Sequence, residues 1–187
     1  VGPPGQLGEP GTFAFNPNAH EPGPQTLLGK TYPDSGRRQG EAALDDLARH
    51  PATARFIATK LARHFISDAP PPALVEKLAA MFRARDGDLR AVSLALLDAD
   101  EAWSAPETKM RTPQEFLMAA LRLIGRLPED PGRMNGSAGL LGQPVWQPPG
   151  PNGFPDTAAA WASPEGIKLR LDIASEVSRR LGDAMDP

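Results

Sequence analysis

The stretch from His50 to Phe65, HPATARFIATKLARHF, constrains the fold more than any other part of the chain. Pro51 is well placed to begin a helix, because the first helical N–H needs no intrahelical acceptor. Apolar residues then recur at spacings of three and four, which puts them on one face of a helix. They are Ala54, Ile57, Ala58, Leu61 and Phe65, with Phe56 and Ala62 widening the face. We therefore predict a core helix over residues 51–65.

Helical patterns cover most of the chain after Gly40, with start and stop signals between them. Gly87 predicts a helix end and Asp88 the cap of the next helix. Thr112-Pro113-Gln114-Glu115 has the pattern of a capping box, and Ser163-Pro164 that of an N-cap with proline in the first turn. Further helices are expected over residues 41–50, 73–85, 89–103, 113–125 and 164–181. Their apolar faces are Ala43, Leu44 and Leu47; Leu74, Val75, Leu78, Met81 and Phe82; Phe116, Leu117, Ala120, Leu121 and Ile124; and Ile167, Leu171, Ala174, Val177 and Leu181.

Two long segments lack a helical period. Residues 1–39 carry alternating Phe13 and Phe15 and a second extended run from Leu28 to Tyr32, which predicts a small hairpin-like arm. Residues 126–162 are rich in proline and glycine and too long for an idle connection. The pattern predicts an all-α fold: a compact bundle of about six helices with a short β-hairpin-like N-terminal arm and a long Pro/Gly-rich loop. We expect an irregular arm over residues 1–39 and one helical domain over residues 40–187.

Composition narrows the possible functions. The 187 residues carry a net charge of −3, which gives no global reason to expect nucleic acid or an anionic membrane as a partner. Cysteine is absent, so disulfides and thiolate chemistry are excluded. No apolar run approaches the length of a membrane span, and no signal segment is present. Because the chain begins at Val1 in a Pro/Gly-rich tract, we expect a fragment of a longer protein.

The candidates for catalysis are His20, Lys60, His64 and Asp68. If the central helix continues past Phe65, His64 and Asp68 lie one turn apart on one face. Neither they nor the acidic pairs fit a metal-binding motif, so no metal and no cofactor is predicted. The run Gly29-Lys30-Thr31 resembles the end of a phosphate-binding loop, but it lacks the first glycine of that pattern.

The segment from Trp146 to Trp161 is the main candidate for ligand binding. It carries Phe154 and Asp156 between its two tryptophans, and exposed aromatic rings with a few polar groups can bind sugars or peptides. The alternative is that these rings close over the helical core, as the loops of small domains often do.

Several segments together resemble a known family. They are FAFNPNAHEPGPQTLLG, LDDLARHPATARFIATKLARHFISDAPPPALV, DGDLRAV, KMRTPQEFLMAALRLIG and LLGQPVWQPPGPNGFPDTAAAW. Over about residues 13–175 the chain resembles the C-terminal part of the uncharacterised bacterial domain-of-unknown-function 1800 family. The resemblance implies a periplasmic or extracellular location and a missing N-terminal helical region. It brings no established reaction. Such proteins usually carry a lysine in the loop after His20, where this chain has Gln25.

Three hypotheses follow. The first is a non-catalytic, exported binding or scaffold module that takes a partner protein or polymer at the cell envelope through the 146–161 loop and the His20 loop. The second is a hydrolase whose site joins His20, Lys60, His64 and Asp68, with or without metal. The third is a scaffold for the missing N-terminal region of the same protein, which an exposed apolar face supports. We expect the charges of the central helix, Arg63 and His64 first among them, to hold the flanking loops.

Overall fold

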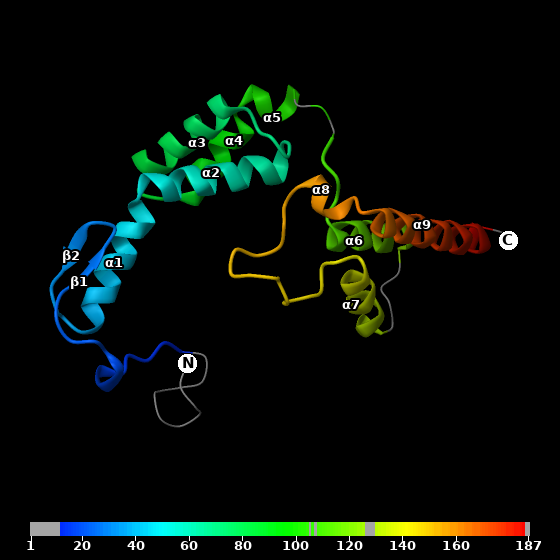
Figure 1. Ribbon diagram of the computed structural model, residues 1–187. Coiled ribbons are helices and arrows are strands. Elements are labelled where there is room, and N and C mark those ends of the chain that lie inside the picture. Colours follow the sequence, from blue (N-terminus) through cyan, green and yellow to red (C-terminus); the bar gives the residue numbers. More distant parts are fainter. Residues whose placement is uncertain (1–11, 105, 107, 126–129, 186–187) are drawn as a thin grey trace. The chain divides into compact units, whose positions relative to one another are not determined.

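The computed structural model describes residues 12–104, 106, 108–125 and 130–185, with side chains to Arg179 (Figure 1). Within these residues, nine helices follow a two-stranded hairpin, so the predicted all-α class with a hairpin-like arm is confirmed. The helices are α1 (Arg37–Arg49), α2 (Pro51–Phe65), α3 (Pro72–Ala84), α4 (Leu89–Leu97), α5 (Asp100–Ser104), α6 (Pro113–Ile124), α7 (Pro131–Leu140), α8 (Ala158–Trp161) and α9 (Pro164–Met185).

The number of helices exceeds the predicted six for two reasons. The helix expected over residues 89–103 is divided into α4 and α5. In addition, α7 and α8 lie within the segment 126–162, which we predicted to be irregular throughout. Asp130 caps α7 by accepting from the Gly132 N–H at 2.8 Å, and Pro131 occupies its first turn. A strong N-terminal cap thus begins a helix whose composition alone suggests a loop.

The hairpin pairs β1 (Gln25–Leu27) with β2 (Lys30–Tyr32) in antiparallel register. The turn consists of Leu28 and Gly29, whose φ values of 49° and 80° are both left-handed. Two consecutive left-handed residues match the twist of the flanking strands. Gly29 therefore serves a hairpin turn, and the run Gly29-Lys30-Thr31 lies outside the strand–loop–helix context of a phosphate-binding loop.

This hairpin is not the predicted one, because Phe13 and Phe15 form no strand in the described part of the arm. The Phe15 ring instead contacts His20 edge to face, with 5.4 Å between the ring centroids. Pairing Leu28–Tyr32 with the Phe13–Phe15 run would have closed a much longer loop. The adjacent Gln25–Leu27 strand needs only a two-residue turn, which costs less conformational entropy.

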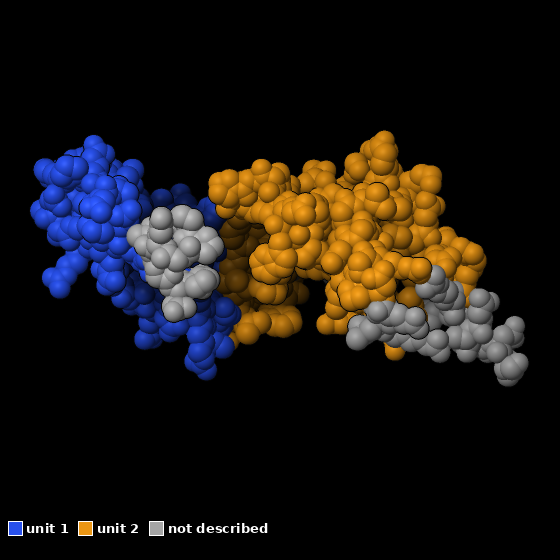
Figure 2. Space-filling model, turned by 90° about the horizontal axis from the view of Figure 1, so that it is seen from below, with its two compact units in different colours: residues 1–58, 76–95 blue, residues 59–75, 96–187 orange. Residues whose placement is uncertain are grey.

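The described residues form two compact units, which Figure 2 colours separately. Unit 1 comprises residues 1–58 and 76–95. Its hairpin lies beside α1, where Asp46 accepts hydrogen bonds from Lys30 and, at 2.7 Å, from the Tyr32 hydroxyl (Figure 1). The buried Gln39 amide donates to the Tyr32 carbonyl at 3.0 Å. The buried apolar residues of this unit are Tyr32, Ala54, Ala58, Leu78, Ala79, Phe82, Val92 and Ala95.

Unit 2 comprises residues 59–75 and 96–187. In it, α6 packs against both α7 and α9 (Figure 1). We call the residues at this junction the α6 cluster: the buried Leu117, Ala138 and Leu141, with Phe116, Leu169 and Ile173 packed against them. The other buried apolar residues of the unit are Ala62, Ile66, Leu74, Val75, Leu96, Ala99 and Trp161.

The prediction that α2 is a core helix is confirmed, although its buried face is narrower than expected. Ala54, Ala58 and Ala62, spaced by four residues, are all fully buried. Phe56 and Phe65 are 56% and 63% exposed, so their assignment to the apolar face was wrong. Phe56 lies about 200° around the helix from Ala54. Phe65 is the last residue of the helix and packs edge to face against His64 instead.

The predicted apolar faces hold for α3 and α6 but fail in part elsewhere. Leu44 in α1 is 67% exposed. In α9, Ile167 and Leu171 are 38% and 63% exposed, whereas Arg170 is only 8% exposed. The packed face of α9 thus includes an arginine, which a search for apolar periodicity excludes by construction. Among the helices within the described ranges, none combines the length and the apolar character needed to cross a bilayer.

Gly136 and Gly125 offer a matched test of backbone conformation. A Cβ atom at either glycine would meet no other atom within 4 Å, but Gly125 has a left-handed φ of 70° and Gly136 lies inside α7. We expect Gly136→Ala to raise the free energy of unfolding by about 0.5–1 kcal/mol, because alanine favours the helix over the unfolded chain. Gly125→Ala should lower it by about 1 kcal/mol, since alanine resists the left-handed cap. Urea unfolding followed by circular dichroism measures both, and equal effects would contradict the assignment of α7 as a helix.

Candidate functional site

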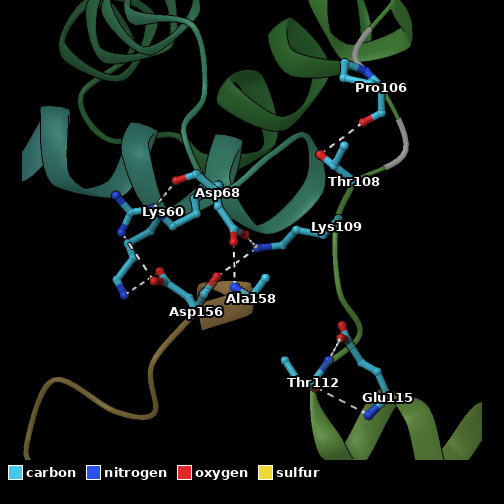
Figure 3. A network of polar contacts seen from close by, with 10 residues as sticks. Lys60, Asp68, Pro106, Thr108, Lys109, Thr112, Glu115, Asp156 and Ala158 are labelled. Carbon is cyan, nitrogen blue, oxygen red and sulfur yellow. Dashed lines mark hydrogen bonds and ion pairs between the residues drawn. The ribbon is translucent and has the colours of Figure 1, made fainter. Parts of the chain in front are cut away.

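Five charged side chains of unit 2 converge where the long loop returns to the helices (Figure 3). We call them the loop anchor: Lys60, Arg63, Asp68, Lys109 and Asp156. The Asp156 carboxylate accepts from Lys60 Nζ at 2.7 Å and from Arg63 Nη1 at 3.3 Å. Lys60 and Arg63 are three residues apart in α2, so helical geometry places them side by side.

Asp68 completes the loop anchor from just beyond the end of α2. One of its carboxylate oxygens accepts from Lys109 Nζ at 2.7 Å, and the other accepts from the Ala158 N–H at 2.5 Å. Lys109 also donates to the Asp156 carbonyl at 2.7 Å, and Arg63 Nε donates to the Asp68 carbonyl at 3.1 Å. Three segments distant in sequence are thereby joined: the end of α2, the irregular segment before α6 and the entry to α8.

The electrostatics keep both carboxylates ionised. The hydrogen bond from Lys109 lowers the pKa of Asp68, and the bond from the Ala158 N–H lowers it further. Partial burial raises the pKa of Asp156, but the Lys60 hydrogen bond and the charges of Lys60 and Arg63 outweigh it, so this pKa is also lowered. Neither carboxyl group has the raised pKa that a general acid needs near neutral pH.

The interactions of the loop anchor hold segments of the chain together. All four carboxylate oxygens accept a hydrogen bond from a cation or a backbone N–H. The five side chains are between 26% and 35% exposed, which is enough burial to strengthen the ion pairs beyond those of the open surface. The expectation that Arg63 holds the flanking loops is confirmed by its bonds to Asp68 and Asp156.

The loop that this anchor holds is fixed at its other end as well. We call residues 143–156 the Trp146 loop; it is drawn in yellow to orange in Figure 1. At its start, the Gln143 side-chain carbonyl accepts from the Gln114 N–H in the first turn of α6 at 2.9 Å. Between the two fixed ends, Trp146 is 93% exposed and has a left-handed φ of 59°. Phe154, near the anchored end, is half-buried.

Trp161 takes a different place from Trp146, although both were predicted as ligand-binding residues. Trp161 is 5% exposed, and its ring lies 4.0 Å from where a Cβ of Gly142 would stand. Two alternatives were open for the aromatic residues of this segment: packing over the core or exposure for ligand binding. Trp161 packs over the core. The Trp146 ring faces solvent.

The structure shows the surroundings of each of the four predicted catalytic residues. Lys60 and Asp68 both belong to the loop anchor, where each is held by a different partner. His64 is exposed in the last turn of α2, and its ring packs on Phe65 with 4.6 Å between centroids. His20 belongs to unit 1, where its Nε2 lies 3.5 Å from Asp34.

Sequence reasoning did not single out two contributors to the loop anchor. Lys109 lies 41 residues from Asp68 in sequence and shows no local motif, and the Ala158 N–H leaves no trace in the sequence at all. One signal was available. The chain has only five lysines, and two of them, Lys60 and Lys109, meet in this cluster.

The comparisons with known proteins identify a family. Over the part of the chain that the structure describes, no three His, Asp or Glu side chains are grouped as a metal site. No curated protein matches the chain, and no solved structure matches it. The model of one family, described as proteins of unknown function (DUF1800), matches residues 4–186, which is more than the predicted 13–175. The chain therefore belongs to the DUF1800 family.

Proposed function

We propose that this chain is a binding module of the bacterial cell envelope and that it takes a partner protein through the Trp146 loop. The observation that carries the proposal is an almost fully exposed tryptophan on a loop held at both ends. Trp146 is 93% exposed, while Gln143 and Asp156 fix the two ends of its loop. The envelope location rests on the family resemblance.

The position of Trp146 carries two costs. Its large apolar ring stays in water, although tryptophan is highly buried on average in folded proteins. Its φ of 59° is one that a residue with a Cβ adopts at a cost of about 1–2 kcal/mol. Exposed ring and strained backbone together favour a contact outside the chain, because strain of this kind gathers at binding sites.

The composition of the loop favours a protein as the partner. Residues 143–155 contain five prolines and no charged side chain. Proline fixes φ, so these five residues restrict the backbone of the loop before binding. A loop that is already held at both ends loses less entropy on binding than a free one. Tryptophan is also among the residues that contribute most to protein interfaces.

The hydrolase alternative receives less support from the geometry. Asp68 is bonded through both oxygens, and its lowered pKa leaves it ionised rather than available as an acid. Lys60 is paired with Asp156. Among Lys60, His64 and Asp68, no nucleophile with an adjacent base is found.

Photo-crosslinking from position 146 tests the proposal. The full-length protein is expressed in the native bacterium with a benzophenone amino acid replacing Trp146, and adducts are identified by mass spectrometry after irradiation. The control replaces Trp103, which is 75% exposed in the same unit and donates to the Leu97 carbonyl. We expect a protein adduct from position 146 that is absent from position 103. With the partner purified, Trp146→Ala should weaken binding at least about tenfold.

Two results would contradict the proposal. One is the same adducts from positions 146 and 103, which would indicate a generally sticky surface. The other is a partner whose affinity is unchanged by Trp146→Ala. Cosedimentation with isolated cell-wall polymer tests the polymer version of the hypothesis: binding that depends on Trp146, without any protein adduct, would replace the proposed partner with a polysaccharide.

A further inference from the structure

Arg170 lies on the packed face of α9, and no described residue supplies it with a counter-charge. It is only 8% exposed, and its guanidinium stands 5.0 Å above the Phe116 ring of the α6 cluster. Its Nε and Nη2 atoms are buried, and neither donates a hydrogen bond to any residue of the described chain. Burial lowers the pKa of Arg170, but arginine still keeps its charge in proteins. The ring face attracts the cation but accepts none of these N–H bonds, and a buried charge without an anion is strongly destabilising. Among the described residues the arrangement has no anion.

The two unpaired atoms specify the shape of that anion. Nε and Nη2 form one edge of the planar guanidinium, and their N–H bonds point in parallel. This edge is the fork that binds the two oxygens of a carboxylate through two parallel hydrogen bonds. On the same helix as Arg170, Leu169 and Ile173 pack against the α6 cluster, as does the Phe116 ring beside the guanidinium. The surroundings of the charge are therefore apolar.

A second unpaired donor borders the same cluster. The indole N–H of the buried Trp161 has no acceptor in the described chain. The Trp161 ring lies against Gly142, and Gly142 follows Leu141, one of the three buried residues of the α6 cluster. Buried polar groups in native proteins are nearly always hydrogen-bonded. Two donors without an acceptor among the described residues, one on α8 and one on α9, thus border one cluster and need an acceptor of the same kind.

We propose that Arg170 and Trp161 form a binding site for a carboxylate: the guanidinium fork takes both oxygens and the indole N–H supplies a further donor. A monoanion suits the site better than phosphate, because one guanidinium balances one charge and apolar walls penalise a second. This site is separate from the Trp146 loop and does not depend on the function proposed for it.

The composition of α7 gives the ligand a way in. This helix contributes Ala138 to the α6 cluster, and three of its ten residues are glycines: Gly132, Gly136 and Gly139. Glycine weakens a helix by about 0.5–1 kcal/mol relative to alanine. Elements of low local stability open far more often than the whole protein unfolds. Because α7 contributes Ala138 to the cluster, its local opening exposes that cluster.

The carboxylate can belong to a small organic acid or to an acidic side chain of a polypeptide, and one titration distinguishes these sources. Trp103→Phe with Trp146→Phe leaves Trp161 as the only tryptophan, so that its indole N–H resonance is unambiguous in a ¹⁵N–¹H spectrum. Acetate, succinate and a capped tripeptide with a central glutamate are titrated, with chloride, sulfate and the glutamine tripeptide as controls at matched ionic strength.

We expect a saturable shift of the Trp161 resonance and a rise in Tm of about 2–4 °C at a ligand concentration of roughly four to five times Kd. Saturation by the free acids identifies a small-molecule site, and saturation by the glutamate tripeptide alone identifies a protein ligand. The proposal is overturned if no carboxylate shifts the resonance, or if chloride and sulfate shift it equally.

Arg170→Met separates a ligand-binding arginine from a structural one. Methionine keeps the bulk and removes the unpaired charge, so the unliganded variant should have a higher Tm than the wild type and no carboxylate response. Arg179→Met, on the exposed side of the same helix, should keep the response. Arg170→Lys keeps the charge without the fork and should weaken binding at least tenfold. A lower Tm for Arg170→Met with an unchanged carboxylate response would show that Arg170 is only structural.

Discussion

Replacing Asp68 with asparagine is expected to lower the free energy of unfolding by about 2 kcal/mol at pH 7. The variant keeps the shape of the side chain but removes the charge that binds Lys109 at 2.7 Å, and an amide N–H can then face the ammonium group. Asp68 and Lys109 are 31% and 26% exposed, so solvent screens the pair only in part. Urea unfolding of the two proteins measures the difference.

The matched control is Asp86→Asn. Asp86 pairs with Arg49 at 2.7 Å, but both side chains are more than 60% exposed, and asparagine tolerates the left-handed φ of 49° at this position. We expect no measurable loss of stability. Hydrogen exchange gives a local readout, because the Ala158 N–H donates to Asp68 and should exchange faster in Asp68→Asn. Equal stability losses for the two variants, with unchanged exchange at Ala158, would contradict the role of the loop anchor.

The difference between wild type and Asp68→Asn should depend on pH in a defined direction. The pKa of Asp68 is lowered in the folded protein, first by the hydrogen bond from Lys109. The unfolded chain therefore binds a proton more readily than the folded one, and acid favours unfolding. The contribution is complete above the unfolded pKa of about 4 and is lost as the pH falls through the lower folded value. The two proteins should thus differ at pH 7 and converge in acid.

Local signals in the sequence predicted helix ends well. The capping box at Thr112 and Glu115 is present with both of its hydrogen bonds, and Asp88 and Ser163 cap α4 and α9 as expected. These signals work because a cap and the N–H groups that it satisfies lie within three residues of each other. Asp130-Pro131 carries the same signal as Ser163-Pro164. This signal marks the start of α7, although the three glycines that follow it favour a loop.

Which face of a helix is buried was harder to predict, because burial depends on the partner as well as on the side chain. A hydrophobic pattern places Leu171 inside α9, yet it is 63% exposed while Arg170 is buried. In α2 the pattern favoured the two phenylalanines, yet the fully buried residues are alanines. A row of small side chains is buried only where another element approaches the helix closely. Apolar periodicity in the sequence does not show where such an element lies.

The loop anchor was beyond local reasoning for a different reason. Lys60 and Asp156 are 96 residues apart, and only the fold brings them within 2.7 Å. Single residues were nevertheless identified: Lys60, Asp68 and Asp156 were all predicted as candidates, although for catalysis or ligand binding. Charged residues next to a proline-rich loop look the same in sequence whether they react with a substrate or hold the loop in place. The pairing partners distinguish the two.

Truncating Leu78 to alanine is expected to lower the free energy of unfolding by about 2–5 kcal/mol, the largest loss among these predictions. Leu78 is fully buried, in the part of α3 that belongs to unit 1. The truncation leaves a cavity, and the favourable free energy of transferring the removed atoms out of water is lost as well. At about 2–4 °C per kcal/mol, the fall in Tm should exceed that of any surface variant. Urea and thermal unfolding followed by circular dichroism measure both quantities.

Leu44→Ala is the matched control for a leucine that is not buried. Leu44 lies in α1 of the same unit, and its truncation removes the same atoms. Because Leu44 is 67% exposed, this variant should change the free energy of unfolding by less than about 0.5 kcal/mol. The two leucines sit in equally plausible helical patterns in the sequence. Comparable losses from both variants would mean that the face of α1 bearing Leu44 is covered in the folded protein. A large loss from Leu78 alone supports the assignment of the core.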